Sequence, residues 1–501
     1  MEKIKMGWAE VDMTPAKGNK ISLAGQFFER ITDEVESPIT VTAFALESGN
    51  DQMVIVSCDL GGVRGEVMVK VREKLNGKID LPLEKIIINA THTHTSMVYK
   101  GSSTIAINNP NMMATLQVLK TLVPEDMAYE PLVSAEECLT PVQCTEIIVN
   151  AICEAVIKAW NGRKAGYYQN AFGRVAVGMC RRVCYDDGSA KMWGETNMAS
   201  FTHLEAGNDS GIELIYTFDE NKQVNGVVAN IACPAQVVEQ RYFISSDYWG
   251  KVKENLEKKF GRRIFVLGLC SAAGDQCPRD LIRWVDPETP VEDPNINHYY
   301  PVERRQDPSM YDISGLKLVG KRISNEIINV FEELDLSQMK NDAVLMHETV
   351  NMTFPLRKVT IAEYEDAKKK IDDFIANNRG KRVTYEENAR LYIYSGIVDR
   401  YEVQQKVNTF DEEIHVIRFD DIAICTNPYE LFLDYGNQIR ARSKAKQTFI
   451  IQLACGAGGY LPTETAEKGS HYSAYVSSGT TGHEGGDILV RQTLEKINKK
   501  F

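Results

Sequence analysis

Short and nearly continuous apolar runs recur along this chain, and several of them end in polar residues beside a glycine or a proline. Residues 55–62 read I-V-S-C-D-L-G-G, and residues 85–94 read K-I-I-I-N-A-T-H-T-H. Such runs indicate strands covered on both faces, because a strand with one face in water alternates apolar and polar residues. The first hundred residues follow the order strand, strand, helix, strand, with the helix near Glu66 to Leu75. We therefore predict an α/β fold of mixed, layered sheets flanked by helices.

The rest of the chain continues this alternation. Apolar residues follow a helical period over 140–160, a strand-rich part runs from 166 to 234, and further helices are predicted at 248–260, 316–334 and 362–378. The stretch 287–308 is rich in Pro, Asp and Asn, which predicts a long surface loop over the site. Composition stays even from end to end without a linker, so we expect one catalytic unit spanning residues 1–501.

Composition and charge disfavour several classes of function. The net charge of −12, without a long stripe of Lys and Arg, disfavours nucleic acid as a partner. The sequence contains no tract of about eighteen apolar residues, so we predict no membrane span. The amino terminus lacks the apolar core of a signal peptide. The eleven cysteines are scattered without a C-x-x-C pair, as in reduced cytoplasmic proteins. We expect a cytoplasmic protein that acts on a small molecule, does not insert into membranes and is compatible with a homo-oligomer.

The histidine motif N-A-T-H-T-H-T, residues 89–95, is the first candidate for chemistry. Side chains at positions i and i+2 of a strand point to the same face, so His92 and His94 are predicted to present two imidazoles to one small volume. Three other segments also follow apolar runs: I-A-C-P-A-Q (231–236), A-A-G-D-Q-C-P-R-D (272–280) and I-C-T-N-P-Y-E (424–430). Loops at strand ends are the usual place for catalytic residues in layered α/β folds.

These segments resemble the neutral ceramidase family of metal-dependent amidases in five places along almost the whole chain. The matching parts are G-W-A-E-V-D-M-T-P (7–15), I-V-S-C-D-L-G-G, the histidine motif, the turn A-A-G-D-Q-C-P, and the pair T-N-P-Y-E with G-G-Y-L-P-T (458–463). The histidine motif is the most specific of them, and the order and spacing agree. The resemblance implies a ceramidase-like catalytic domain.

The resemblance also implies a catalytic zinc ion held by two histidines, a glutamate and a tyrosine. Carried over to this chain, His92, Glu430 and Tyr460 would bind the metal, His94 would contact the attacking water or the tetrahedral intermediate, and Arg181 in M-C-R-R would face the substrate carbonyl. Zinc chemistry agrees with these residue types, because nitrogen and oxygen ligands with one open position allow a bound water to reach a pKa of roughly 7.

The chain departs from the family where the second histidine ligand is expected, because Cys233 stands there. A thiolate is a good zinc ligand but makes the metal a weaker Lewis acid. Gln236 or Glu239 could offer an oxygen instead. The alternative interpretation is a buried apolar cysteine, with the metal lost or rearranged.

A second departure is Cys277, at the position of a serine close to the metal. A thiol of low pKa beside zinc could be a nucleophile, although a packing change is the more common reason for such a replacement. Asp275 in the same turn is the better candidate for polar support. Asp59 and the pair His483 and Glu484 are predicted to contact substrate or to support the site.

We expect this chain to correspond to the catalytic domain alone, without the additional carboxy-terminal β-domain of secreted ceramidases, and no basic amphipathic helix suggests a membrane surface. Hydrolytic chemistry is therefore predicted more firmly than lipid specificity. The leading hypothesis is a zinc-dependent hydrolase that cleaves an amide bond of a small polar or amphipathic molecule. The alternatives are a zinc-dependent esterase or lactonase acting on a sugar-like substrate, a small-molecule-binding protein without activity, and a metal-free cysteine enzyme.

Overall fold

Three sheets in this protein share one strand arrangement, and together they explain the apolar runs. The computed structural model describes residues 3–26, 30–49, 51–99, 123–128, 138–285, 305–306 and 313–501. The first sheet has the order β6 (Ile86–Ala90), β5 (Asp51–Cys58), β4 (Thr40–Ser48), β1 (Lys5–Asp12) and β7 (Lys164–Ala165). The second has the order β15 (Phe265–Cys270), β14 (Val224–Ile231), β13 (Gly211–Phe218) and β8 (Tyr167–Arg174). The third has the order β19 (Leu345–Pro355), β20 (Thr409–Phe419), β21 (Ile422–Thr426) and β23 (Gln447–Ile451).

Each sheet contains an antiparallel hairpin followed by a helical crossover to a parallel strand. The hairpins are β4–β5, β13–β14 and β20–β21. The crossovers run through α1 (Gly65–Leu75), α5 (Tyr248–Phe260) and α9 (Leu433–Arg442), and the parallel partners are β6, β15 and β23. The carboxyl ends of the two parallel strands therefore lie side by side at one edge of every sheet.

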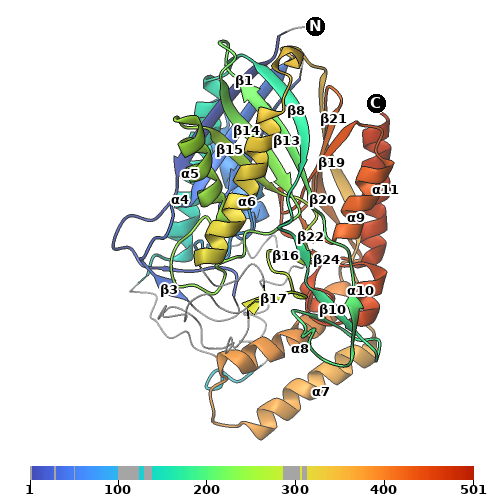
Figure 1. Cartoon of the computed structure of the whole chain (residues 1–501). Coiled ribbons are helices and arrows are strands. Elements are labelled where there is room, and N and C mark those ends of the chain that lie inside the picture. Colours follow the sequence, from blue (N-terminus) through green and yellow to red (C-terminus); the bar gives the residue numbers. More distant parts are fainter. Residues whose placement is uncertain are drawn as a thin grey trace.

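The inner faces of the three sheets pack against one another, and helices cover the outer faces. One core cluster joins residues of all three sheets, for example Val56, Leu267 and Ile424, with α1 and α4 (Pro141–Asn161). The outer face of the second sheet packs on α5 and α6 (Ile313–Glu332), and that of the third on α9 and α11 (His483–Asn498). Figure 1 shows α5 and α6 in front of β13 and β14, with α11 along the other side. Burial on both faces accounts for the apolar runs, and the predicted α/β class is confirmed.

Smaller elements connect these layers. The short strands are β2 (Ile21–Ser22), β3 (Ile31–Thr32), β9 (Met179–Cys180), β10 (Arg182–Tyr185), β11 (Ala190–Met192), β12 (Phe201–Leu204), β16 (Gln276–Cys277), β17 (Trp284–Val285), β18 (Arg305–Gln306), β22 (Tyr429–Leu431) and β24 (Gly459–Leu461). The remaining helices are α7 (Ile361–Asn377), α8 (Tyr385–Gln404), α10 (Glu464–Gly469) and the 3₁₀ turns Leu83–Lys85, Leu336–Gln338 and Val476–Ser478. Helices α7 and α8 form a separate small cluster below the sheets in Figure 1.

The helix predictions agree with the structure where the sequence carries a clear apolar period. The helix predicted at 248–260 coincides with α5, which begins after the side-chain cap of Asp247 and ends at Gly261 in the left-handed conformation. The other four predicted helices lie within three residues of the observed bounds at each end. Apart from 305–306, the predicted loop 287–308 lies outside the described residues. Among the helices that the structure describes, none combines the length and the apolar character needed to cross a membrane.

Gly7 in β1 provides a test of how closely helix and sheet pack. A Cβ atom at Gly7 would overlap the carbonyl oxygen of Ala159 in α4, which is backbone and cannot move aside cheaply. We expect Gly7→Ala to lower the free energy of unfolding by about 1–3 kcal/mol, measured by urea denaturation. Gly207→Ala is the control, because its Cβ would meet no atom within 4 Å. Equal stability of the two variants would contradict the close packing of α4 on β1.

Candidate active site

The loops after the parallel strand pairs converge and bring the predicted residues together. Chain segments after β6, β14, β15, β21 and β23 supply, in that order, His92 with His94, Gln236 with Glu239, Asp275, Glu430 and Tyr460. Arg181 lies between β9 and β10, and its backbone N–H donates to the carbonyl of Asp275. Three sheets thus contribute to one buried group of side chains, which we call the His92 cluster: His92, His94, Arg181, Gln236, Glu239, Glu430 and Tyr460.

His92 and His94 lie together, but not for the reason predicted. Strand β6 ends at Ala90, and His92 has a φ of 67°, in the left-handed region that a non-glycine residue rarely occupies. The backbone N–H groups of Thr91 and Thr93 donate to carbonyls at the end of β5 and hold this turn. The two imidazole Nε2 atoms are 3.5 Å apart. The prediction of strand geometry at this motif is therefore wrong, whereas the proximity of the two rings is as predicted.

The hydrogen bonds of His92 show which ring nitrogen faces the cluster with a lone pair. Its Nδ1 lies 2.5 Å from the carbonyl oxygen of Gly61, and because a carbonyl only accepts, Nδ1 carries the hydrogen. Nε2 of the neutral ring then has a lone pair, and it lies 3.3 Å from Oε2 of Glu430. Two acceptors face each other here, an arrangement that a shared cation or a second proton on the ring would stabilise. This pair therefore fits metal binding.

His94 has a polar partner near each ring nitrogen. Oε1 of Gln236 accepts from Nη1 of Arg181 at 3.2 Å, which orients the amide so that its Nε2 donates to Nε2 of His94 at 2.8 Å. The hydrogen of the neutral ring is therefore on Nδ1, which lies 3.0 Å from Oε2 of Glu239. A carboxylate behind an imidazole fixes its tautomer and orientation, so His94 is arranged as a proton acceptor.

The arrangement predicts a pH dependence. Burial lowers the pKa of His94 below its ordinary value of 6.5, and the nearby Glu239 carboxylate counteracts that decrease. Because a base must be unprotonated, the acid limb of kcat/KM should lie below pH 6.5. Glu239→Gln removes the opposing carboxylate, so the limb should move to lower pH and kcat should fall by about 10–100-fold. The measurement is a pH–rate profile with Glu213→Gln as control, and a limb that stays in place or moves upward would contradict the role of Glu239.

Arg181, Tyr460 and Glu430 form the other half of the cluster. Nη2 of Arg181 donates to the Tyr460 hydroxyl at 3.3 Å and lies 4.0 Å from Oε2 of Glu430. Tyr460 in turn donates to the hydroxyl of Tyr472 at 3.4 Å, a residue the sequence analysis did not identify. Burial alone would raise the pKa of Glu430, but a second proton on the His92 ring, together with the charge of Arg181, outweighs burial and lowers this pKa. Glu430 is therefore a carboxylate beside fixed positive charge.

Cys233 lies outside this group of contacts. Its Sγ donates to the carbonyl of Val177 at 3.4 Å, and the side chain belongs to the apolar core beneath the second sheet. The ligand atoms of His92, Cys233 and Glu430 are not gathered within 4.8 Å of one another, although all three residues are described. A ligand role for Cys233 stays a prediction. It would require the thiol to give up its hydrogen bond to the Val177 carbonyl and to bind the cation instead. Gln236 and Glu239, considered as alternative oxygen ligands, contact His94 instead.

Cys277 and Asp275 lie near Arg181 in the turn after β15. The Sγ of Cys277 donates to the Arg279 carbonyl at 3.2 Å, and burial raises the pKa of this thiol to about 12. The thiol is thus protonated at neutral pH, opposite to the low pKa required of a nucleophile. Asp275 Oδ1 accepts from the N–H of Leu433, at the start of α9, at 2.9 Å. Asp275 therefore links this turn to α9, which agrees with the predicted polar support.

Asp59 lies beside the histidine loop, whereas His483 lies elsewhere. Asp59 Oδ1 accepts from the Thr91 hydroxyl at 3.3 Å, next to His92. His483 begins α11, and its Nδ1 lies 2.8 Å from Oε2 of Glu467 in α10, away from the described contacts of the His92 cluster. Glu484 follows it in the first turn of α11. Asp59 thus orients the histidine loop, whereas His483 joins two helices.

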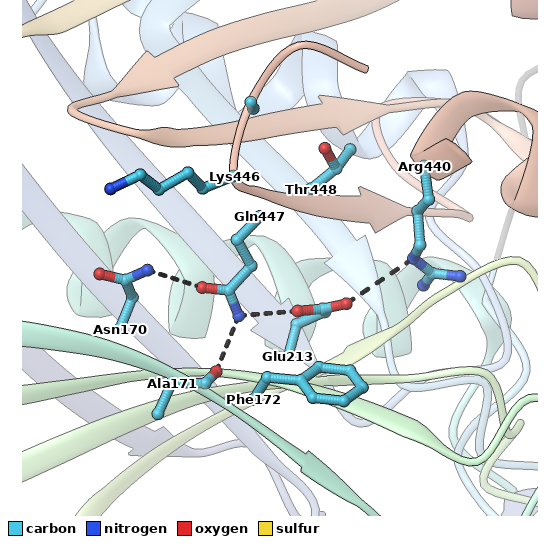
Figure 2. A pocket seen from close by; sticks show the side chains of 9 residues that line it. Asn170, Ala171, Phe172, Glu213, Arg440, Lys446, Gln447 and Thr448 are labelled. Carbon is cyan, nitrogen blue, oxygen red and sulfur yellow. Dashed lines mark hydrogen bonds and ion pairs between the residues drawn. The ribbon is translucent and has the colours of Figure 1, made fainter. Parts of the chain in front are cut away.

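A surface pocket elsewhere in the molecule lacks the groups expected of this chemistry. It lies between β8, β13 and β23, and Figure 2 shows its lining side chains. Its carboxylate, Glu213, already accepts from Gln447 at 2.7 Å and faces Arg440 at 3.9 Å. No histidine or cysteine lines the pocket. We therefore place the candidate active site at the His92 cluster.

Comparison with solved structures identifies the fold. The crystal structure of neutral ceramidase from Pseudomonas aeruginosa matches with a TM-score of 0.66 and 16% identity, over 99% of this chain and 74% of that chain. A structure described as ceramidase complexed with C2 matches with a TM-score of 0.64 and 14% identity, over 99% and 75% of the two chains. No family model and no curated protein matches the sequence. The chain therefore has a ceramidase-like fold.

Proposed function

We propose that this protein is a zinc-dependent hydrolase that cleaves an amide bond in a small polar or amphipathic molecule. The observation that carries the proposal is the lone pair of His92 Nε2 facing the Glu430 carboxylate, with His94 next to His92 and Arg181 next to Glu430. The ceramidase-like fold supports the class of reaction. His92, Glu430 and Tyr460 would hold the zinc ion, which supplies a water of lowered pKa and polarises the scissile carbonyl.

The protein's own residues transfer the proton, stabilise the oxyanion and position these groups. His94 accepts the proton of the attacking water at Nε2 once that water replaces Gln236 as the donor to this nitrogen, and Glu239 stabilises the imidazolium that forms. The fixed charge of Arg181 stabilises the oxyanion that develops on the carbonyl. Gln236 contacts both Arg181 and His94 and fixes the position of one relative to the other. Proton transfer by His94 to the amine then completes the cleavage.

The cell compartment and the partner are part of the proposal. All eleven cysteines are free thiols in the structure, which supports a reducing compartment such as the cytoplasm. The negative net charge of −12 supports a small-molecule substrate over nucleic acid. The acyl group and the leaving group are left to a substrate panel.

The test compares amides and esters that share the same acyl group, with the protein before and after chelation. We expect amide hydrolysis that chelation removes and added Zn²⁺ restores. Hydrolysis of the esters alone would overturn the amide assignment in favour of the esterase alternative. If no compound is hydrolysed and no metal is bound, while a panel compound raises the melting temperature, the protein is a binding protein and the proposal fails.

The Cys233→Ser variant tests whether Cys233 or solvent is the fourth ligand of the proposed zinc ion. Elemental analysis of this variant beside the wild-type protein measures zinc per chain. A loss of one zinc ion would make Cys233 a ligand, as predicted from the sequence. Unchanged zinc would leave the fourth position to solvent, in agreement with the contact between the thiol and Val177.

A further inference from the structure

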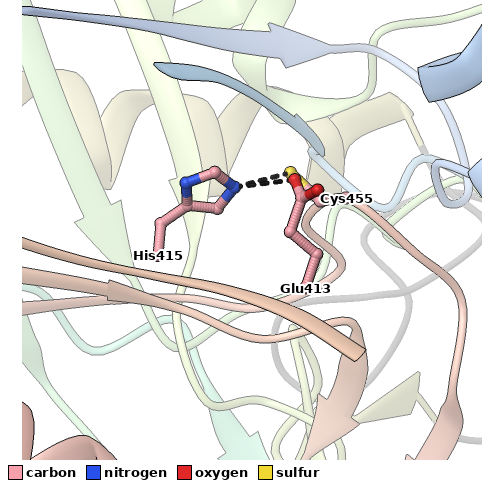
Figure 3. A group of neighbouring side chains, drawn as sticks. All are labelled: Glu413, His415 and Cys455. Atoms are coloured by element: carbon pink, nitrogen blue, oxygen red, sulfur yellow. Dashed lines mark hydrogen bonds and ion pairs between the residues drawn. The ribbon is translucent and has the colours of Figure 1, made fainter. Parts of the chain in front are cut away.

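A second group of metal-ligating side chains lies apart from the His92 cluster. Glu413 and His415 are on β20, Cys455 follows β23, and one ligand atom from each lies within 4.8 Å of the others (Figure 3). His415 Nε2 is 2.9 Å from Oε1 of Glu413 and 3.4 Å from Sγ of Cys455. Among the described residues, this is the one group of three or more His, Cys, Asp or Glu side chains whose ligand atoms lie this close together.

The hydrogen bonds around His415 show that its Nε2 has no hydrogen in the neutral ring. His347 Nδ1 donates to the carbonyl of Gln52 at 3.2 Å, so His347 Nε2 is an acceptor and receives the hydrogen of His415 Nδ1 at 2.9 Å. The Thr349 hydroxyl gives its hydrogen to the carbonyl of Glu84 and lies 3.3 Å from the same Nδ1, where it can only accept. Two independent contacts therefore place the ring hydrogen on Nδ1.

The lone pair of His415 Nε2 thus faces a carboxylate at hydrogen-bond distance. Arg72 donates to both oxygens of Glu413 at 2.8 and 2.6 Å, the bidentate arrangement of an ionised carboxylate. A single thiol hydrogen on Cys455 cannot satisfy both the ring nitrogen and the carboxylate. His415 Nε2 and Glu413 Oε1 are 2.9 Å apart, too close for a water molecule between them. A cation between the three ligand atoms removes this conflict.

We propose that Glu413, His415 and Cys455 form a second metal site, which takes a zinc ion. Nitrogen, sulfur and oxygen donors from three side chains are a ligand set that zinc accepts, with a fourth position for water. With the thiolate formed on binding, the two anionic ligands and Arg72 leave a net charge of −1 to receive the cation. The inference is independent of the proposed function, since it uses none of the residues of the His92 cluster.

The place of this site indicates a structural role. The backbone N–H of Cys455 donates to the carbonyl of Ile88 in β6, and Glu413 is paired with Arg72 of α1. A metal ion here would tie β20 to the segment after β23, and that segment contacts β6 through Cys455 and Ile88 a few residues before the histidine motif. Its loss should therefore lower the melting temperature and loosen the turn that carries His92.

Cobalt substitution tests the site, because a thiolate ligand gives Co²⁺ a charge-transfer band in the near ultraviolet. We titrate Co²⁺ into metal-free full-length wild-type protein and into Cys455→Ser, with Cys425→Ser as the matched buried-cysteine control. We expect the band in the wild type and in Cys425→Ser, and its loss in Cys455→Ser. A band of unchanged intensity in Cys455→Ser, with circular dichroism showing a folded protein, overturns the site and leaves a charged imidazolium as the partner of Glu413.

Two further measurements separate this site from the proposed active site. His92→Ala should keep the Cys455-dependent band, and loss of the band in that variant would assign the thiolate ligand to the His92 cluster instead. X-ray absorption on zinc-loaded His92→Ala/Cys233→Ser needs no change at the second site and removes the other candidate thiolate ligand, so it remains decisive if Cys455→Ser does not fold. A sulfur neighbour at about 2.3 Å supports the site, and a shell of nitrogen and oxygen alone overturns it.

Discussion

A His92→Ala variant is expected to lose one zinc ion per chain and to hydrolyse its amide substrate at least about 10³-fold more slowly, because the reaction loses the water activation that zinc supplies. The variant removes the Nε2 lone pair that faces Glu430 at 3.3 Å. Zinc content by elemental analysis and kcat/KM with one substrate are measured on the same preparation. A folded variant that keeps the full zinc content would show that the ligand set is wrong.

The matched control is His483→Ala, which also removes an imidazole beside a glutamate. His483 pairs with Glu467 at the junction of α10 and α11, so its loss should leave both zinc content and rate unchanged. Because Cys455 and His415 are untouched in either variant, a loss of metal in His92→Ala is assigned to the His92 cluster alone. Comparable losses in both variants would indicate a general effect on folding.

The strands that carry the site could be predicted because burial on both faces leaves a clear sequence signal. The apolar runs that precede His92 and Glu430 contain almost no polar residue, and the candidate site residues come directly after these runs. The same argument places Cys455 after the run of β23, although the sequence analysis did not single it out. The spacing of Glu413 and His415 on one face of β20 was a second available signal.

Contacts between sheets could not be predicted in the same way. Glu239 was considered as a metal ligand because its side chain is polar and near Cys233 in sequence. Its contact with His94 exists only because the second sheet packs beside the first, which no local pattern encodes. The left-handed backbone of His92 is likewise set by carbonyls at the end of β5.

The missed helices have ordinary physical reasons. Helix α8 lacks a continuous apolar stripe, because it packs on α7 and on the 3₁₀ turn Val476–Ser478 rather than on a sheet. Helix α11 contains Gly485 and Gly486, which normally disfavour a helix. A Cβ atom at Gly486 would overlap the ring of Tyr435 in α9, so close packing of the two helices explains this residue.

A His94→Ala variant should lose turnover while it keeps its zinc. We expect kcat to fall by about 10²–10⁴-fold, the usual contribution of a positioned general base, and the acid limb of the pH profile to disappear. Zinc content should equal that of the wild type, because the contacts between His92 and Glu430 do not involve His94. Loss of zinc together with turnover would make His94 a ligand and not a base.

A double-mutant cycle sharpens this assignment. Glu239 contacts the Nδ1 side of His94, so if it acts only through that ring, Glu239→Gln should slow the wild-type enzyme but have no further effect in the His94→Ala background. All rates are measured at one pH above the acid limb, where His94 is deprotonated in the proteins that retain it. Additive losses would mean that Glu239 reaches the substrate by itself, and the proton acceptor would then have to be sought among the carboxylates of the His92 cluster.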